Sequence, residues 1–135
     1  MAFSDFKVGM TASTSKTITE TDVILFAGIS TDINPVHLDE EAAKNGIFKK
    51  RVAHGILVSG LISAVLGNKL PGPGSIYMGQ ELRFTAPVFI GDTITAEVEI
   101  IEVIPEKCRI KLATTCKNQD GVVVITGSAL IMNRG

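Results

Sequence analysis

The feature that most restricts the fold is an apolar run over residues 56–67, which reads Ile-Leu-Val-Ser-Gly-Leu-Ile-Ser-Ala-Val-Leu-Gly. A helix of this sequence is apolar on nearly every face, and helices of that kind are usually buried inside a protein. The Pro-Gly-Pro-Gly segment at 71–74 then ends the helix with a turn. We therefore predict a central buried helix, around which the rest of the chain must fold.

After this helix, apolar and polar residues alternate with the period of half-buried strands. The alternation slips at Ile100-Ile101, which predicts a β-bulge. Asp120-Gly121 predicts a hairpin turn between the last two strands. A buried helix followed by an antiparallel meander predicts an α+β fold in which a sheet wraps around the helix. The four expected strands cover about 75–85, 92–104, 107–118 and 121–132.

The first part of the chain carries one strand signal followed by a helix signal. Residues 11–18 are rich in Ser and Thr and predict a first strand that joins the sheet. Thr19 is a suitable N-cap, and Asp22 three residues later completes a variant of the capping box. We expect the helix that starts there to end near Ile29.

Residues 30–38 are expected to form a loop. They contain Asn34-Pro35, and the residue before a proline is pushed out of the helical region of backbone space. Asp39 then predicts the cap of a short helix over 40–44, closed by Asn45-Gly46.

The size and composition of the chain limit what it can be. Its 135 residues suit one domain with a sizeable core, so we expect a single domain over residues 1–135. A hydrophobic share of 45% and a charged share of 20% exclude a disordered chain. No apolar stretch reaches the roughly 20 residues that span a bilayer, and the N-terminus lacks the pattern of a secretory signal. We expect a cytoplasmic protein without a membrane partner.

Charge and cysteine content exclude further classes. A net charge of −1 gives no clustered basic surface for nucleic acid, so an anionic partner must be small or bound locally. Cys108 and Cys116 lie in the same expected strand, roughly 26 Å apart, which is too far for a disulfide. The sequence has no Cys-x-x-Cys pair, so we do not expect a structural zinc site or a redox site.

Asp32 and His37 are the strongest candidates for chemistry. Residues five apart lie about 140° apart around a helix, so they converge only if the chain between them turns. Asn34-Pro35 supplies a stiff turn. A carboxylate next to an imidazole can act as an acid/base pair, because one group takes a proton while the other delivers one. The spacing alone is weak evidence and favours an Asx-turn beside a surface histidine.

His54-Gly55 directly precedes the expected buried helix. Amides at a helix start have no intrahelical acceptor and lie at the positive end of the helix dipole, so those of Gly55 and Ile56 could bind an oxyanion. Gly55 lacks a Cβ, which would let a ligand carbonyl approach. Alternatively, the helix start simply needs a small residue, and His54 is a packing or capping residue. A metal triad of Asp32, His37 and His54 lacks any HxxxH-like pair, and we expect no metal.

Three consecutive basic residues, Lys49, Lys50 and Arg51, precede this segment. They could contact the phosphates of a nucleotide-bearing substrate or an acidic carrier protein. The alternative is an ordinary solvated face with three exposed charges.

Together these residues resemble the MaoC-like (R)-specific enoyl-CoA hydratases. Residues 26–37 read Phe-Ala-Gly-Ile-Ser-Thr-Asp-Ile-Asn-Pro-Val-His and, with Ala43 after a gap of five, are similar to the hydratase 2 motif of that family. Thr31 stands where the motif often has glycine. The resemblance covers roughly 8–132 and includes Ala53-His54-Gly55, residues 71–77, and residues 83–88 with Gly91-Asp92.

The resemblance implies a hot-dog fold, a homodimer, and reversible syn addition of water to trans-2-enoyl-CoA to give (R)-3-hydroxyacyl-CoA. It implies acyl-CoA as substrate and neither a metal nor an organic cofactor. An enzyme of this kind would serve fatty acid metabolism or polyhydroxyalkanoate supply.

The resemblance also assigns roles to residues by position. Asp32 and His37 would hold and activate the water, and the Gly55 N–H would bind the thioester oxygen. The supporting or substrate-binding residues would be Asn34, Ser63, Leu66 and His54.

Three rival functions remain open. A dehydratase acting on acyl carrier protein would use Lys49, Lys50 and Arg51 as its docking patch. A hot-dog thioesterase is less favoured, because the helix after His54-Gly55 carries no acidic residue as base or nucleophile. A non-catalytic module that binds acyl thioesters would retain Asp32 and His37 without using them.

Overall fold

The computed structural model describes residues 2–135, and its largest element is an antiparallel sheet of five strands. In chain order the elements are β1 (Thr11–Thr17), α1 (Glu20–Ser30), α2 (Pro35–Leu38), α3 (Glu40–Lys44), α4 (Gly55–Asn68), β2 (Ile76–Phe84), β3 (Thr93–Ile104), β4 (Arg109–Lys117) and β5 (Val123–Met132). Short 3₁₀ turns lie at Phe3–Asp5 and Pro105–Lys107. The strand order is β1-β3-β4-β5-β2.

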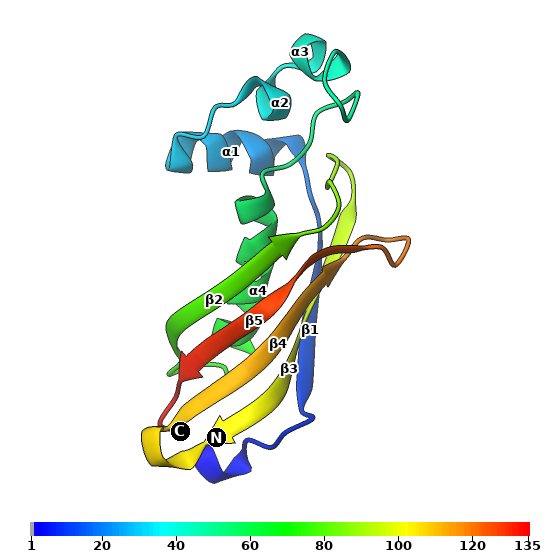
Figure 1. Cartoon of the computed structure of the whole chain (residues 1–135). Helices are drawn as coiled ribbons and strands as arrows, with labels where there is room; N and C mark the ends of the chain where they lie inside the picture. Colours follow the sequence, from blue (N-terminus) through cyan, green and yellow to red (C-terminus); the bar gives the residue numbers. More distant parts are fainter. Residues whose placement is uncertain (1) are drawn as a thin grey trace.

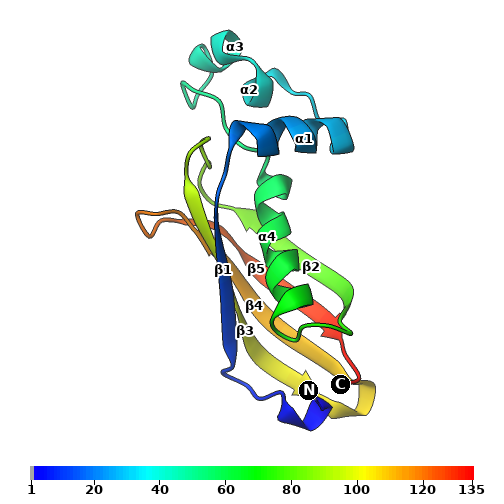
Figure 2. The same cartoon turned by 180° about the vertical axis from the view of Figure 1, so that it is seen from behind.

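Helix α4 lies along one face of this sheet, against β1, β3 and β4 (Figures 1 and 2). The predicted α+β hot-dog arrangement, a sheet wrapped around a helix, is therefore confirmed. The side of α4 that faces the sheet is buried among the inward side chains of the strands. Its four fully buried residues are Val58, Ile62, Val65 and Leu66.

The other side of α4 is not buried within the chain. Ile56 is 56% exposed, and Gly60 and Ser63 are exposed as well. The prediction of burial on every face is wrong for a single chain, because one sheet can cover only one side of a helix.

Most of the predicted element bounds are correct to within one or two residues. The bulge appears as a register shift between Ile100 and Glu102, and the Asp120-Gly121 turn links β4 to β5 with Gly121 at φ 77°. Thr19 and Asp22 form the predicted capping box of α1. These features are recovered because each depends on residues close together in the sequence.

The prediction of a continuous loop over 30–38 is wrong, since α2 forms one helical turn inside it. Asn34 is the N-cap of this turn and Pro35 occupies its first position. Proline is disfavoured inside a helix but suits its first position, where its fixed φ is already helical and no N–H is needed. The same Asn-Pro pair that blocks a helix before it therefore starts one after it.

Helices α1, α2 and α3 lie together beyond the N-terminal end of α4. They form the end of the molecule opposite both chain termini (Figures 1 and 2). None of the helices in residues 2–135 is long and apolar enough to cross a membrane. Cys108 precedes β4 in a left-handed conformation rather than lying within the strand, and both it and Cys116 are free thiols.

Candidate active site

The structure brings Asp32, His37 and His54 together at the start of α4. One ligand atom from each residue lies within 4.8 Å of those of the other two. Asp32 is exposed, His37 is half-buried and His54 is buried. The acid/base pair predicted from the sequence therefore converges, with a second histidine behind it.

The chain reaches this arrangement through a sharp change of direction after α1. Thr31 ends the helix in the left-handed conformation with φ 66°. Glycine adopts this conformation without strain, which explains why a glycine suits this position in the related motif. The Ser30 hydroxyl accepts a hydrogen bond from the Asp32 N–H at 3.1 Å and holds the turn.

Asn34 connects the two members of the pair. Its N–H donates to Asp32 Oδ1 at 3.3 Å, and its carbonyl accepts from the His37 N–H at 2.9 Å. Its side-chain Oδ1 accepts from the Val36 N–H at 3.1 Å and caps α2. The structure thus places Asn34 between the carboxylate and the helical turn that carries the imidazole.

The hydrogen bond of the His37 ring defines its tautomer. Nδ1 lies 2.7 Å from the carbonyl oxygen of Val52. A carbonyl oxygen can only accept, so Nδ1 carries the hydrogen and Nε2 of the neutral ring carries a lone pair. His37 can therefore accept a proton at Nε2.

His54 lies behind the pair, inside the protein. It is 2% exposed, and its Nε2 lies 2.9 Å from the backbone carbonyl oxygen of Asp32. Its ring stacks on that of His37 with centroids 3.9 Å apart, and Phe26 packs on it with centroids 4.8 Å apart. The side chain makes no cap hydrogen bond to α4, so of the two structural roles weighed from the sequence, packing is present and capping is not.

Gly55 begins α4 with its amide in the first turn, where a helix offers no acceptor. A Cβ added to Gly55 would lie 2.6 Å from ring atoms of Phe84. The missing side chain therefore makes room for a phenyl ring of the protein, and close packing explains this glycine without a ligand. The amide itself stays at the positive end of the helix dipole.

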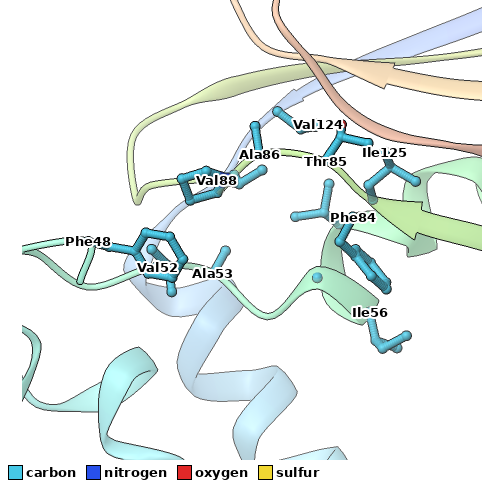
Figure 3. A pocket seen from close by; sticks show the side chains of 13 residues that line it. Phe48, Val52, Ala53, Ile56, Phe84, Thr85, Ala86, Val88, Val124 and Ile125 are labelled. Atoms are coloured by element: carbon cyan, nitrogen blue, oxygen red, sulfur yellow. The ribbon is translucent and has the colours of Figure 1, made fainter. Parts of the chain in front are cut away.

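Gly55 and Val52 also line a pocket of about 410 Å³ between the start of α4 and the ends of β2 and β5 (Figure 3). Its opposite wall includes Phe84, Val88 and Ile125. Asp32 and His37 do not line this pocket. The segment 52–55 therefore borders both the apolar pocket and the Asp32–His37 pair.

The three basic residues separate in the structure. The prediction of an exposed charge is wrong for Arg51, which is only 8% exposed. Its guanidinium pairs with Glu20 at 2.6 Å and Glu40 at 3.7 Å, and its Nε donates to the His37 carbonyl at 2.8 Å. Helices α1, α2 and α3 meet here, and a planar guanidinium with several donors can bind all three. Arg51 is therefore occupied by the protein itself and is withdrawn as a phosphate or carrier contact.

Lys49 and Lys50 remain at the surface. The Lys50 ammonium lies 4.3 Å from the centre of the Phe89 ring. Two positive charges therefore stay near the pocket wall that Phe48 and Val52 form.

Ser63 and Leu66 are not brought to the pair within one chain. Ser63 lies roughly 12 Å along α4 from Gly55, on the exposed side. Leu66 is 1% exposed and belongs to the core. The structure gives neither residue a contact with Asp32 or His37.

Sequence reasoning did not identify Phe26, Phe84 or Glu20 as parts of this region. Phe26 lies in the motif, but nothing local shows that its ring packs on His54. Glu20 and Arg51 are 31 residues apart, and no sequence pattern indicates that they pair.

The chain is similar to known proteins over nearly its full length. The chain is 53% identical over 130 residues to an (R)-specific enoyl-CoA hydratase of Rhodospirillum rubrum, which covers 96% of this chain and 90% of the relative. It is 50% identical to a 3-hydroxybutyryl-CoA dehydratase of Methylorubrum extorquens, over 96% of this chain and 82% of that one.

Among solved structures, the unliganded R-hydratase PhaJ1 of Pseudomonas aeruginosa superimposes with a TM-score of 0.92 at 47% identity. The superposition covers 98% of this chain and 84% of that one. The model of the MaoC-like domain matches residues 5–122. The chain belongs to the MaoC-like domain family.

Proposed function

We propose that this protein is an (R)-specific enoyl-CoA hydratase, which adds water reversibly to trans-2-enoyl-CoA and gives (R)-3-hydroxyacyl-CoA. The observation that carries the proposal is the convergence of the Asp32 carboxylate and the His37 imidazole beside the first amide of α4. The hydratase and dehydratase relatives support the same reaction.

The proposed mechanism uses the tautomer of His37. Its Nε2 takes a proton from water while Asp32 accepts a hydrogen bond from the same water. The water oxygen bonds to the β-carbon, and the electron pair of the double bond moves to the thioester oxygen as an enolate. The Gly55 amide donates to that oxygen. His37 then returns the proton to the α-carbon on the same face, which completes a syn addition of one water.

The proposed hydration requires neither a metal nor an organic cofactor, because proton transfer and one oxyanion donor suffice. The largely apolar pocket beside Gly55 suits the hydrocarbon part of a thioester. A cytoplasmic enzyme of this kind would exchange enoyl-CoA with an (R)-3-hydroxyacyl-CoA pool that fatty acid metabolism or polyhydroxyalkanoate synthesis draws on.

We further propose that the enzyme works as a homodimer joined through β2. This strand is an edge of the sheet, and an unpaired edge is a ready surface for a second chain. It carries exposed apolar side chains, namely Ile76, Tyr77, Met78 and Phe84. Joining two such edges would also bring a second chain toward the open side of α4. Light scattering on the purified protein should give twice the 14.3 kDa of one chain, and a stable monomer would contradict this proposal.

The hydration itself is tested with crotonyl-CoA, whose conjugated absorbance disappears as water adds. We expect the protein to bleach it and to give the (R) product. Asp32→Asn should lower kcat by about 10²–10⁴-fold, while Glu106→Gln, an exposed acidic residue at the other end of the sheet, should leave it unchanged. Folded protein without activity on enoyl-CoA esters of several chain lengths would overturn the proposal.

The exposed Lys49 and Lys50 favour a second candidate, a dehydratase for acyl carrier protein thioesters. Comparison of kcat/KM for the two kinds of thioester separates the candidates. If the carrier protein is the substrate, Lys49→Glu with Lys50→Glu should reduce its kcat/KM far more than that of the CoA ester.

A further inference from the structure

His54 touches both members of the acid/base pair through different parts of its ring. Its Nε2 lies 2.9 Å from the Asp32 carbonyl oxygen, and its face stacks on the His37 imidazole at 3.9 Å with the ring planes 30° apart. It also directly precedes Gly55, whose amide is the proposed oxyanion donor. His54 therefore contacts Asp32 and His37 and is also the sequence neighbour of Gly55.

The hydrogen bonding of His54 is one-sided. Because a carbonyl only accepts, Nε2 carries the hydrogen and Nδ1 carries the lone pair. Nδ1 is fully buried and has no hydrogen-bond partner within residues 2–135. A buried nitrogen without a partner costs folding free energy, which an apolar ring in the same place would avoid. Packing alone therefore does not explain a histidine here.

The bond to Asp32 belongs to a larger pattern. Within the described chain, the hydrogen bonds that join residues 31–38 to distant parts of the sequence all end on residues 51–54. Arg51 donates to the His37 carbonyl, the Val52 N–H donates to the Val36 carbonyl, and His37 Nδ1 bonds to the Val52 carbonyl. The remaining bonds of that segment are local turns and caps.

Among these bonds, that of His54 is the one that reaches the carboxylate end of the segment. The other three end on α2 and fix His37. Asp32 itself is exposed and follows the left-handed Thr31. Without the His54 bond, the Asp32 backbone would be tied only to its sequence neighbours.

We propose that His54 is a positioning residue for hydration: its Nε2–H fixes the Asp32 backbone and its ring face fixes the plane of the His37 imidazole. The Asp32 carboxylate and the His37 Nε2 are thereby held at fixed positions relative to the Gly55 amide. This inference rests on the proposed function and adds to it the residue that aligns the site.

Two variants separate the two contacts. His54→Phe keeps a flat ring against His37 but removes the donor to Asp32, whereas His54→Gln keeps an N–H near the position of Nε2 and removes the ring. We expect His54→Phe to lower kcat on crotonyl-CoA by about 10- to 100-fold, since small displacements of catalytic groups cost this much. KM should change less than about twofold, and His54→Gln should recover part of the lost kcat.

A core variant controls for general loss of stability. Ile62→Val shortens a fully buried side chain on the same helix, away from the pair. It should lower Tm without lowering kcat. If His54→Phe does not fold, His54→Gln carries the test, and its segment 30–38 should exchange amide hydrogens as slowly as the wild type.

Hydrogen–deuterium exchange of the peptide covering 30–38 gives a readout that does not depend on catalysis. We expect faster exchange there in His54→Phe than in the wild type or in Ile62→Val. Wild-type kcat in His54→Phe would overturn the inference, and so would a loss of kcat with unchanged exchange over 30–38. A wild type that hydrates no enoyl thioester would reject the proposed function, while the exchange result would still decide whether His54 holds the segment.

Discussion

The Nδ1 atom of His37 lies 2.7 Å from the carbonyl oxygen of Val52, which leaves Nε2 as the basic nitrogen of the ring. His37→Asn tests this assignment, because the asparagine amide can still donate near the position of Nδ1 but has nothing at Nε2. We expect kcat to fall by about 10²–10⁴-fold, with Tm close to that of the wild type. Activity within tenfold of the wild type would show that Nε2 is not the base.

Gly55→Ala tests whether packing demands the glycine. The new Cβ would lie 2.6 Å from the Phe84 ring, which must move. A displaced aromatic side chain is an overpacking cost, so we expect a loss of about 1 kcal/mol. Urea unfolding measures this. Adding Phe84→Leu should restore the stability. A double variant as unstable as Gly55→Ala would show that the Phe84 ring is not the cause of the loss.

Arg51→Met removes the bonds that join α1, α2 and α3. The side chains of Glu20 and Glu40 are 60% and 59% exposed, so their ion pairs with Arg51 contribute little to the free energy of unfolding. The main loss is the charged hydrogen bond to the His37 carbonyl, worth about 1–3 kcal/mol. We expect a clear drop in Tm on thermal unfolding, with a much smaller drop for Glu20→Gln. Equal effects of the two changes would mean that the ion pair dominates.

Asp22 should make the stability of α1 depend on acidity. Burial raises the pKa of this carboxyl, but hydrogen bonds from Lys16 and Thr19 outweigh burial and bring it below its ordinary value of 3.8. A lowered pKa stabilises the fold above pH 3.8 and ceases to do so as the pH falls through the lowered value. The difference in unfolding free energy between the wild type and Asp22→Asn should therefore be constant near neutral pH and shrink below about pH 4. A difference that grows in acid would contradict this sign.

The two cysteines should react at different rates. Cys116 is fully buried, and burial raises the pKa of its thiol to about 11, so it is almost entirely protonated at pH 8. Cys108 is partly exposed. We expect a thiol reagent to label Cys108 in the native protein and Cys116 only after denaturant is added, which intact mass spectrometry can count. Rapid native labelling of Cys116 would contradict the described burial.

Several parts of this protein were determined by residues close together in the sequence. The capping box of Thr19 and Asp22, the turn at Gly121 and the bulge after Ile100 were predicted correctly, because caps, tight turns and alternation depend on neighbours along the chain. The sequence also predicted that Asp32 and His37 lie close together, as they do in the structure, although the spacing was weak evidence until the surrounding motif was considered, and their catalytic roles stay predictions.

The tertiary structure decided which distant residues support that pair. Nothing in the local pattern indicates that His54 reaches the Asp32 carbonyl, that Arg51 is buried against Glu20, or that Phe84 requires a glycine at position 55. Each contact joins residues between 22 and 31 positions apart. The sequence thus determined the local elements and the reactive groups, whereas their alignment came from packing, because only the folded chain brings α1, α2 and the start of α4 to one place.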